Sequence, residues 1–246
     1  MLIPVAIVNQ TSVAPPPSSP VSGMLAWYDA SVVASITTVS DAVSQWNDQS
    51  GNGNTLTQGT AGDRPLYGGA GARTINGITA VEFVSNDFLA SAVDRSSRTQ
   101  TTFVVGVVDS LAAVRTMLGV DSATGGNQFR LETTGLVDTL KETVIGLFAS
   151  NHVAITLPFV VCQQLSGTAI THWQAQSGNV ELYKESLAEA TAFTAGKTLR
   201  VGVRVTTEGW DGLMGEIIIY NSTLSNDDVA LNISYLRNKW GLADVL

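Results

Sequence analysis

Hydrophobic and polar residues alternate along several short stretches of this chain, most clearly over residues 198–206. In an extended strand, side chains at every second position share one face, and those between share the other. Here the apolar positions are Leu199, Val201, Val203 and Val205, and the positions between them include Arg200 and Arg204. The pattern predicts a half-buried antiparallel strand whose apolar residues face the core and whose arginines face solvent or a partner.

Other stretches of the same kind are separated by turns rich in glycine, asparagine, aspartate and serine. They cover residues 80–83, 101–108, 129–132, 143–148, 159–163, 169–173, 180–183 and 215–220. Many short strands at this spacing are typical of an all-β sandwich or barrel. Their number on one chain favours a single large sandwich.

One helix is predicted near the C-terminus. Ser225 is followed three residues later by Asp228, which is the spacing of an N-cap and its acidic partner. Apolar residues then recur at intervals of four, three and four, at Val229, Ile233, Leu236 and Trp240. Because this spacing puts them on one helix face, we expect that face to pack on the sandwich and the helix to end before Gly241.

Residues 1–23 differ from the rest, because four of the seven prolines of the chain lie between positions 15 and 20. We predict an extended N-terminal arm, followed by one domain over residues 24–246. An apolar segment and a stiff spacer would anchor the arm to a partner, through Leu2, Ile3, Val5, Ile7, Val8, Pro15, Pro16 and Pro17. The alternative is that the arm folds back on its own domain.

The charge and composition of the chain disfavour several classes of partner and cofactor. The 246 residues include 13 basic and 21 acidic ones, for a formal net charge of −8, which disfavours binding to nucleic acid or to an anionic membrane. A single cysteine, Cys162, cannot form an internal disulfide, and two histidines are few for a zinc site. The sequence shows neither a membrane-spanning apolar run nor the pattern of a secretory signal.

Four segments carry a resemblance to a known family. Residues 25–31 read LAWYDAS, residues 43–54 read VSQWNDQSGNGN, residues 75–83 read INGITAVEF, and residues 215–220 read GEIIIY ahead of a helix that ends in KWGL. In this order they resemble the concanavalin A-like lectin/glucanase superfamily, specifically the LamG-like jelly-roll domains of bacteriophage virion proteins. The resemblance implies an antiparallel jelly-roll β-sandwich with one short C-terminal helix.

The resemblance and the arm together imply a non-enzymatic phage virion protein. We expect a capsid decoration or cement protein at the virion surface. It would be a homo-oligomer or present in many copies of an assembly, and bound to the major capsid protein or to tail components. Glucanases of the superfamily carry two catalytic carboxylates on one strand, whereas Glu216 has no acidic residue two or four positions further on, so we expect no enzyme activity. The alternatives are a carbohydrate-binding, receptor-binding module of a tail or fibre that contacts surface glycans and, third, a degenerate glycan hydrolase.

One candidate site is a loop that resembles the start of a calcium-binding loop. Asp48, Ser50 and Asn52 supply oxygen atoms at its first, third and fifth positions, and Gly53 follows. The twelfth position is Gly59 instead of the expected glutamate. Calcium is therefore the one cofactor with some support, and the alternative is a turn in which Asp48 binds backbone amides without an ion.

A second candidate site would bind carbohydrate. Trp46 adjoins the calcium-like loop, and Trp210 lies beside Asp211 in a glycine-rich loop. Tryptophan rings stack on sugars, and a neighbouring carboxylate can accept hydrogen bonds from hydroxyl groups. The alternative is that both indoles pack in the core.

Overall fold

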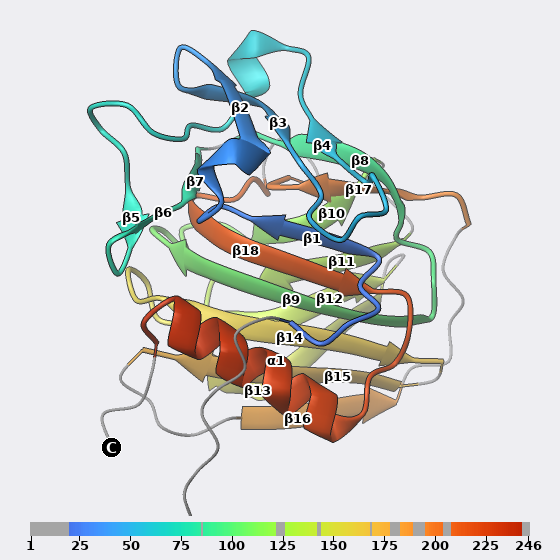
Figure 1. Cartoon of the computed structure of the whole chain (residues 1–246). Coiled ribbons are helices and arrows are strands. Elements are labelled where there is room, and N and C mark those ends of the chain that lie inside the picture. The colour runs from blue at the N-terminus through green and yellow to red at the C-terminus, as the bar shows by residue number, and fades with distance from the viewer. Residues whose placement is uncertain are drawn as a thin grey trace, which may run out of the picture.

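The computed structural model describes residues 20–84, 86–121, 126–141, 144–167, 169–177, 183–188, 195–203 and 208–242. Within these ranges two antiparallel β-sheets pack face to face, and one α-helix lies across the front of the smaller sheet (Figure 1). The predicted all-β, jelly-roll-like sandwich with a C-terminal helix is therefore confirmed. Among the described residues, no helix is long and apolar enough to span a membrane.

The smaller sheet has the strand order β1-β18-β9-β14-β15-β16, with β7 also paired to β18. Its strands are β1 (Ala26–Asp29), β7 (Val81–Phe83), β9 (Thr99–Val108), β14 (Phe159–Ser166), β15 (Ala169–Gln176), β16 (Tyr183–Ala188) and β18 (Gly212–Tyr220). Every residue of β18 is buried, because its inner face packs on the other sheet and the helix covers its outer face.

The larger sheet has the strand order β13-β12-β11-β10-β17-β8-β4-β3-β2. Its strands are β2 (Ile36–Val39), β3 (Ala42–Trp46), β4 (Leu56–Thr57), β8 (Leu89–Asp94), β10 (Arg115–Val120), β11 (Asn127–Leu131), β12 (Leu136–Lys141), β13 (Val144–His152) and β17 (Thr198–Val201). A separate hairpin joins β5 (Thr74–Ile75) to β6 (Ile78–Thr79), and two short 3-10 helices are η1 (Val33–Ser35) and η2 (Ala61–Asp63).

The alternating stretch at residues 198–206 forms β17 over its first four residues. Leu199 and Val201 are fully buried, and Val203 just beyond the strand is 4% exposed. Arg200 points the other way and places its guanidinium 4.7 Å from the centroid of the Phe88 ring. The predicted orientation is confirmed for these residues, whereas Arg204 and Val205 lie outside the described residues.

The predicted C-terminal helix is α1 (Asn226–Lys239). The Ser225 hydroxyl caps it by accepting a hydrogen bond of 3.1 Å from the backbone N–H of Asp228. The apolar face is buried as expected, with exposed fractions of 0% to 3% at Val229, Ile233, Leu236 and Trp240. Capping and periodicity therefore predicted both ends of the helix and the face that packs on the sheet.

The described chain begins at Pro20, so the anchoring residues of the predicted arm, Leu2 to Pro17, lie outside the described residues. The last residues before the sandwich lie against α1 and β18. The backbone N–H of Val21 donates to the side-chain oxygen of Asn232 at 3.0 Å, and the Tyr220 hydroxyl donates to the Val21 carbonyl at 2.7 Å. These bonds fix where the chain leaves the domain.

Asp87, in the turn between β7 and β8, makes stability depend on pH. Burial raises the pKa of its carboxyl from 3.8 to about 6; the hydrogen bond from the Val84 N–H opposes this rise, and the charges of Asp63 and Glu82 add to it. Because the folded-state pKa lies above the unfolded one, the folded protein loses stability as the pH rises from about 4 to above 6.

We therefore expect Asp87→Asn to raise the thermal midpoint at pH 7.5 and to leave it nearly unchanged at pH 4. The amide oxygen keeps the bond to Val84, which lies at 2.9 Å in the parent protein. The gain is about 1 kcal/mol, since solvent reaches part of the side chain and screens its charge. Melting curves at both pH values test this, and an equal shift at the two values would contradict it.

Candidate functional site

The two tryptophans expected to stack on a sugar are both buried. Trp46 and Trp210 have exposed fractions of 0%, and their rings pack on Tyr28 and Phe159 at centroid distances of 6.0 and 6.1 Å. The prediction of exposed stacking faces is therefore wrong, because the sandwich uses these large side chains to fill its core. The loop at Asp211 turns its carboxylate toward Arg115, with an N–O distance of 3.3 Å.

The calcium-like loop is a hydrogen-bonded turn in which the Asp48 carboxylate binds protein donors. One oxygen accepts from the backbone N–H of Trp27 and of Ser50, both at 2.9 Å. The other accepts from the Ser50 hydroxyl at 2.8 Å and the Asn54 N–H at 2.9 Å. Asn52 donates its amide to the Met24 carbonyl at 2.8 Å. Hydrogen bonds within the protein therefore account for the positions of Asp48, Ser50 and Asn52, which tie the loop to β1.

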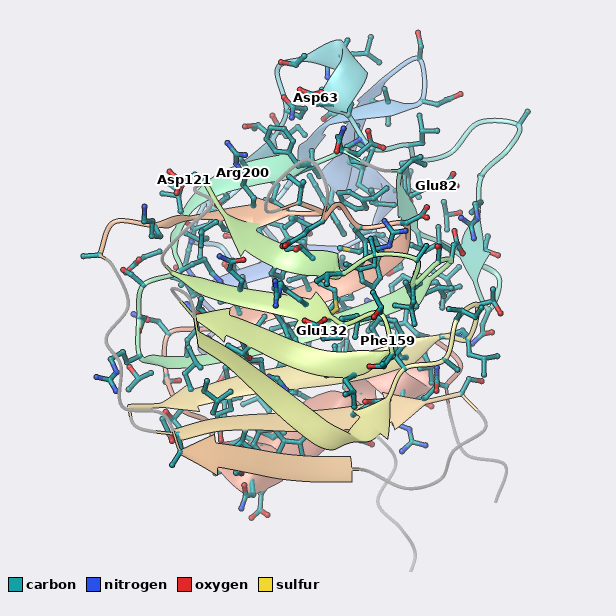
Figure 2. All side chains as sticks on the ribbon, turned by 180° about the vertical axis from the view of Figure 1, so that it is seen from behind. Asp63, Glu82, Asp121, Glu132, Phe159 and Arg200 are labelled. Carbon is teal, nitrogen blue, oxygen red and sulfur yellow. The ribbon has the colours of Figure 1, made fainter. Side chains whose placement is uncertain are left out.

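A pocket lies at the margin of the sandwich, where the β2–β3 hairpin meets β7. It has a volume of about 210 Å³. The side chains that line it include Ser40, Asp41, Leu66, Tyr67, Arg73 and Glu82. Figure 2 shows Glu82 on the opposite side of the molecule from Asp121 and Arg200. Sequence reasoning did not single out this pocket, because its walls come from three separate segments.

Backbone pairing holds the three segments together. Leu66 forms antiparallel bridges with both Ala42 and Glu82, so the segment between them acts as a short central strand. The backbone N–H of Tyr67 donates to the Asp41 carbonyl at 2.8 Å. The Tyr67 hydroxyl donates to the Ala30 carbonyl at 2.6 Å and is anchored to the core side of the pocket. The floor of the pocket is therefore built on fixed elements.

The hairpin turn that forms one wall has a strained backbone. Val39 pairs with Ala42, so Ser40 and Asp41 are its two central residues, with φ values of +50° and +66°. Such a turn normally uses Asn-Gly, as the β5–β6 hairpin does with Asn76 and Gly77. Side chains in the left-handed region cost about 1–2 kcal/mol. A strained turn in the wall of a pocket points to a functional role for Asp41.

The Asp41 carboxylate lies against the backbone of Gly69. A Cβ at position 69 would lie 2.3 Å from the nearer carboxylate oxygen, so a larger residue there would require the Asp41 side chain to move. Within the described part of the chain, no donor hydrogen-bonds to the Asp41 carboxylate, and the residue is exposed. Asp41 therefore offers two acceptor oxygens to a ligand.

Arg73 also lines the pocket and is held by two carboxylates. Its Nη1 lies 3.0 Å from Glu82 Oε1, its Nη2 lies 2.8 Å from Asp109 Oδ1, and Nη1 also contacts the second oxygen of Asp109. These partners, Asp109 first, raise the pKa of Arg73 above its ordinary value. The guanidinium is therefore charged and fixed in position, and it orients the Glu82 carboxylate in the pocket.

A second acidic pair lies under α1. Neighbouring strands β1 and β18 place Asp29 directly opposite Glu216, and Lys239 contacts both carboxylates. Glu216 has no acidic residue two or four positions further on, as the sequence analysis noted, but the neighbouring strand supplies Asp29 as an acidic partner. The carboxylate side chains are 4% and 0% exposed. This pair is enclosed, and it fastens the helix to the sheet.

The fold is similar to that of several carbohydrate-active proteins. A GH54 α-L-arabinofuranosidase soaked with a cyclic sulfate inhibitor superposes with a TM-score of 0.63 at 16% identity, over 90% of this chain and 60% of that chain. Domain 4 of AbnA, a GH43 extracellular arabinanase from Geobacillus stearothermophilus, in complex with arabinotriose, has a TM-score of 0.59 at 12% identity, over 87% of this chain and 98% of that chain. Trypanosoma rangeli sialidase has a TM-score of 0.58 at 11% identity, over 89% of this chain and 33% of the sialidase chain.

These likenesses define a β-sandwich that glycoside hydrolases and a sialidase also contain. At such low identity they establish the fold alone, and the chain spans 60% of the arabinofuranosidase chain and 33% of the sialidase chain. No protein-family profile and no curated protein sequence matches the chain.

The neighbours contradict the expected function. A non-enzymatic capsid decoration protein was the expectation, yet the similar structures are an arabinofuranosidase, a domain of an arabinanase and a sialidase. They give no support to a phage context. The expectation failed because it assigned a role from a few shared segments and an arm, whereas one fold serves many functions that only the site distinguishes. The expectation of no enzyme activity is wrong as well, because these similar structures belong to enzymes.

Proposed function

We propose that this domain recognises carbohydrate as part of a carbohydrate-active protein, and that the pocket between Asp41 and Arg73 binds the sugar. The observation that carries the proposal is the strained turn, which holds the unpaired Asp41 carboxylate in the wall of an open pocket. Groups held in costly conformations cluster at binding and catalytic sites.

The chemistry of the pocket suits a sugar. The Asp41 and Glu82 carboxylates accept hydrogen bonds from hydroxyl groups, and Leu66, which is 43% exposed, offers an apolar surface to the C–H face of a ring. The volume of about 210 Å³ is smaller than the roughly 300–1,000 Å³ of drug-sized sites, and therefore suits one or two sugar units.

The similar structures support the same class of ligand. Domain 4 of the arabinanase is covered over 98% of its length and was solved in complex with arabinotriose. This neighbour is a separate domain with a bound oligosaccharide, and the present chain has nearly the same extent. Arabinotriose is therefore the first ligand to test.

A second candidate function at the same pocket is glycoside hydrolysis. Its support is the presence of two carboxylates in different settings, since Glu82 is paired with Arg73 and Asp41 is not. Glycosidases use two carboxyl groups whose environments differ, so that one acts as the acid and the other as nucleophile or base. Catalysis and recognition would then share Asp41.

Calorimetric titration with arabinotriose, xylotriose and galactotriose tests the proposal. We expect at least one of these sugars to bind saturably, and Asp41→Ala to weaken that binding at least tenfold. Asp227→Asn is the matched control, because Asp227 is an exposed carboxylate in the first turn of α1 and does not line the pocket. Binding that survives Asp41→Ala would refute the site.

Release of reducing sugar from arabinan, measured in parallel, separates the two candidates. Hydrolysis that is lost in both Asp41→Asn and Glu82→Gln would establish the second function. Binding without release of sugar by the parent protein would leave recognition as the function of the pocket.

A further inference from the structure

The charges around the pocket are unequal. Asp41, Glu82 and Arg73 line it, and Asp109 contacts Arg73 from outside. Three carboxylates and one guanidinium thus lie in or beside the pocket, which leaves an excess of two negative charges (3 − 1 = 2). The whole chain is acidic as well, with a net charge of −8, so its field adds to the local excess.

Arg73 already binds two carboxylates of the protein. Recognition of a carboxylate by arginine uses two parallel N–H groups of the guanidinium. Asp109 occupies one such pair, because Nη1 contacts one of its oxygens and Nη2 lies 2.8 Å from the other. Glu82 binds Nη1 as well, at 3.0 Å. Three of the five N–H groups are thus engaged by the protein.

The Asp41 carboxylate of the pocket is a free acceptor. The Asp41 carboxylate has no donor among the described residues, so it binds ligands that bring hydrogen-bond donors. Sugar hydroxyls are such donors. A ligand carboxylate brings no donor at neutral pH, it would lie near an excess of two negative charges, and the one guanidinium of the pocket already binds two carboxylates of the protein.

We infer that the pocket selects neutral saccharides and rejects acidic ones such as uronic and sialic acids. This inference rests on the proposed function, because it names the class of sugar that the same site takes. The shared fold does not decide it, since one of the similar structures is a sialidase and another is a domain in complex with arabinotriose. The charge of the site is what favours neutral over acidic sugars.

The test compares matched sugars by calorimetry at low ionic strength. Galactotriose and α-1,4-linked trigalacturonate form one pair, lactose and sialyllactose form the other, and arabinotriose is the further neutral probe. We expect the tightest neutral sugar to bind at least tenfold more tightly than either acidic sugar. Because salt screens charges, the difference should shrink at 0.5 M sodium chloride. It should also shrink in Asp41→Asn, and remain in the Asp227→Asn control.

The outcomes separate the two claims. An acidic sugar that binds as tightly as the best neutral one, or more tightly, would overturn the inference while leaving the proposed function in place. If neither these five sugars nor xylotriose binds to the parent protein, the proposed function fails, and the inference fails with it.

Discussion

Replacing Glu216 with alanine is expected to lower the free energy of unfolding by about 3–5 kcal/mol, because buried donors lose their common acceptor. Four groups donate to this fully buried carboxylate. Trp27 Nε1 and the Tyr235 hydroxyl bind one oxygen at 2.7 and 3.0 Å. Lys239 Nζ and Trp240 Nε1 bind the other at 2.8 and 2.7 Å. The carboxylate thus joins β1 and α1 to β18.

Urea and thermal denaturation measure this effect, which corresponds to a fall in the thermal midpoint of roughly 10 °C for a chain of this size. Glu216→Gln is the matched control. It keeps one oxygen acceptor for two of the four donors, whereas its amide nitrogen cannot accept from the other two. We expect Gln to lose less stability than Ala. An alanine variant with an unchanged midpoint would show that the four bonds contribute nothing to the fold.

The substitution Asp41→Gly is expected to make the protein more stable and to weaken sugar binding at least tenfold. Glycine adopts the left-handed region without strain, so the turn gains about 0.5–1 kcal/mol after the entropy of glycine in the unfolded chain is counted. The same change removes the acceptor oxygens of the pocket wall. Gains in stability that cost activity are common where a binding site holds strain.

The β5–β6 hairpin supplies the control. Gly77→Asp places aspartate in the same left-handed turn position, where φ is +87° and nothing lies within 4 Å of an added Cβ. It should therefore lower stability by about the amount that Asp41→Gly raises it, and leave binding unchanged. Melting curves and titrations of the two variants test the pair. A destabilised Asp41→Gly protein would mean that Asp41 stabilises the fold and that its turn is not strained.

Periodicity and capping predicted the elements that depend on local sequence. Alternation placed Leu199 and Val201 in the core, and Ser225 with Asp228 marked the start of α1. These predictions succeed because side-chain period and capping chemistry act within a few residues.

Other features could not be predicted in this way, because they depend on which segments meet. A tryptophan beside a polar turn suits both a binding loop and a core, and only the packing of Trp46 on Tyr28 decides between them. Asp29 lies opposite Glu216 because β1 and β18 are neighbours in the sheet, and local sequence does not reveal the order of the strands. The pocket could not be predicted because it forms only where Leu66 pairs with both β3 and β7. One local signal was available: Ser40 and Asp41 stand where a hairpin turn prefers Asn-Gly.

The most direct measurement is a titration of isotope-labelled protein with arabinotriose, followed through the backbone amide resonances. Binding in the proposed pocket should shift the amides of Asp41, Tyr67, Gly68 and Arg73 most, because these residues line it. Amides around Asp48 and Asp211, in the loops that sequence analysis favoured, should move little. Shifts centred on those loops, or no shifts at saturating sugar, would contradict the assignment of carbohydrate recognition to this pocket.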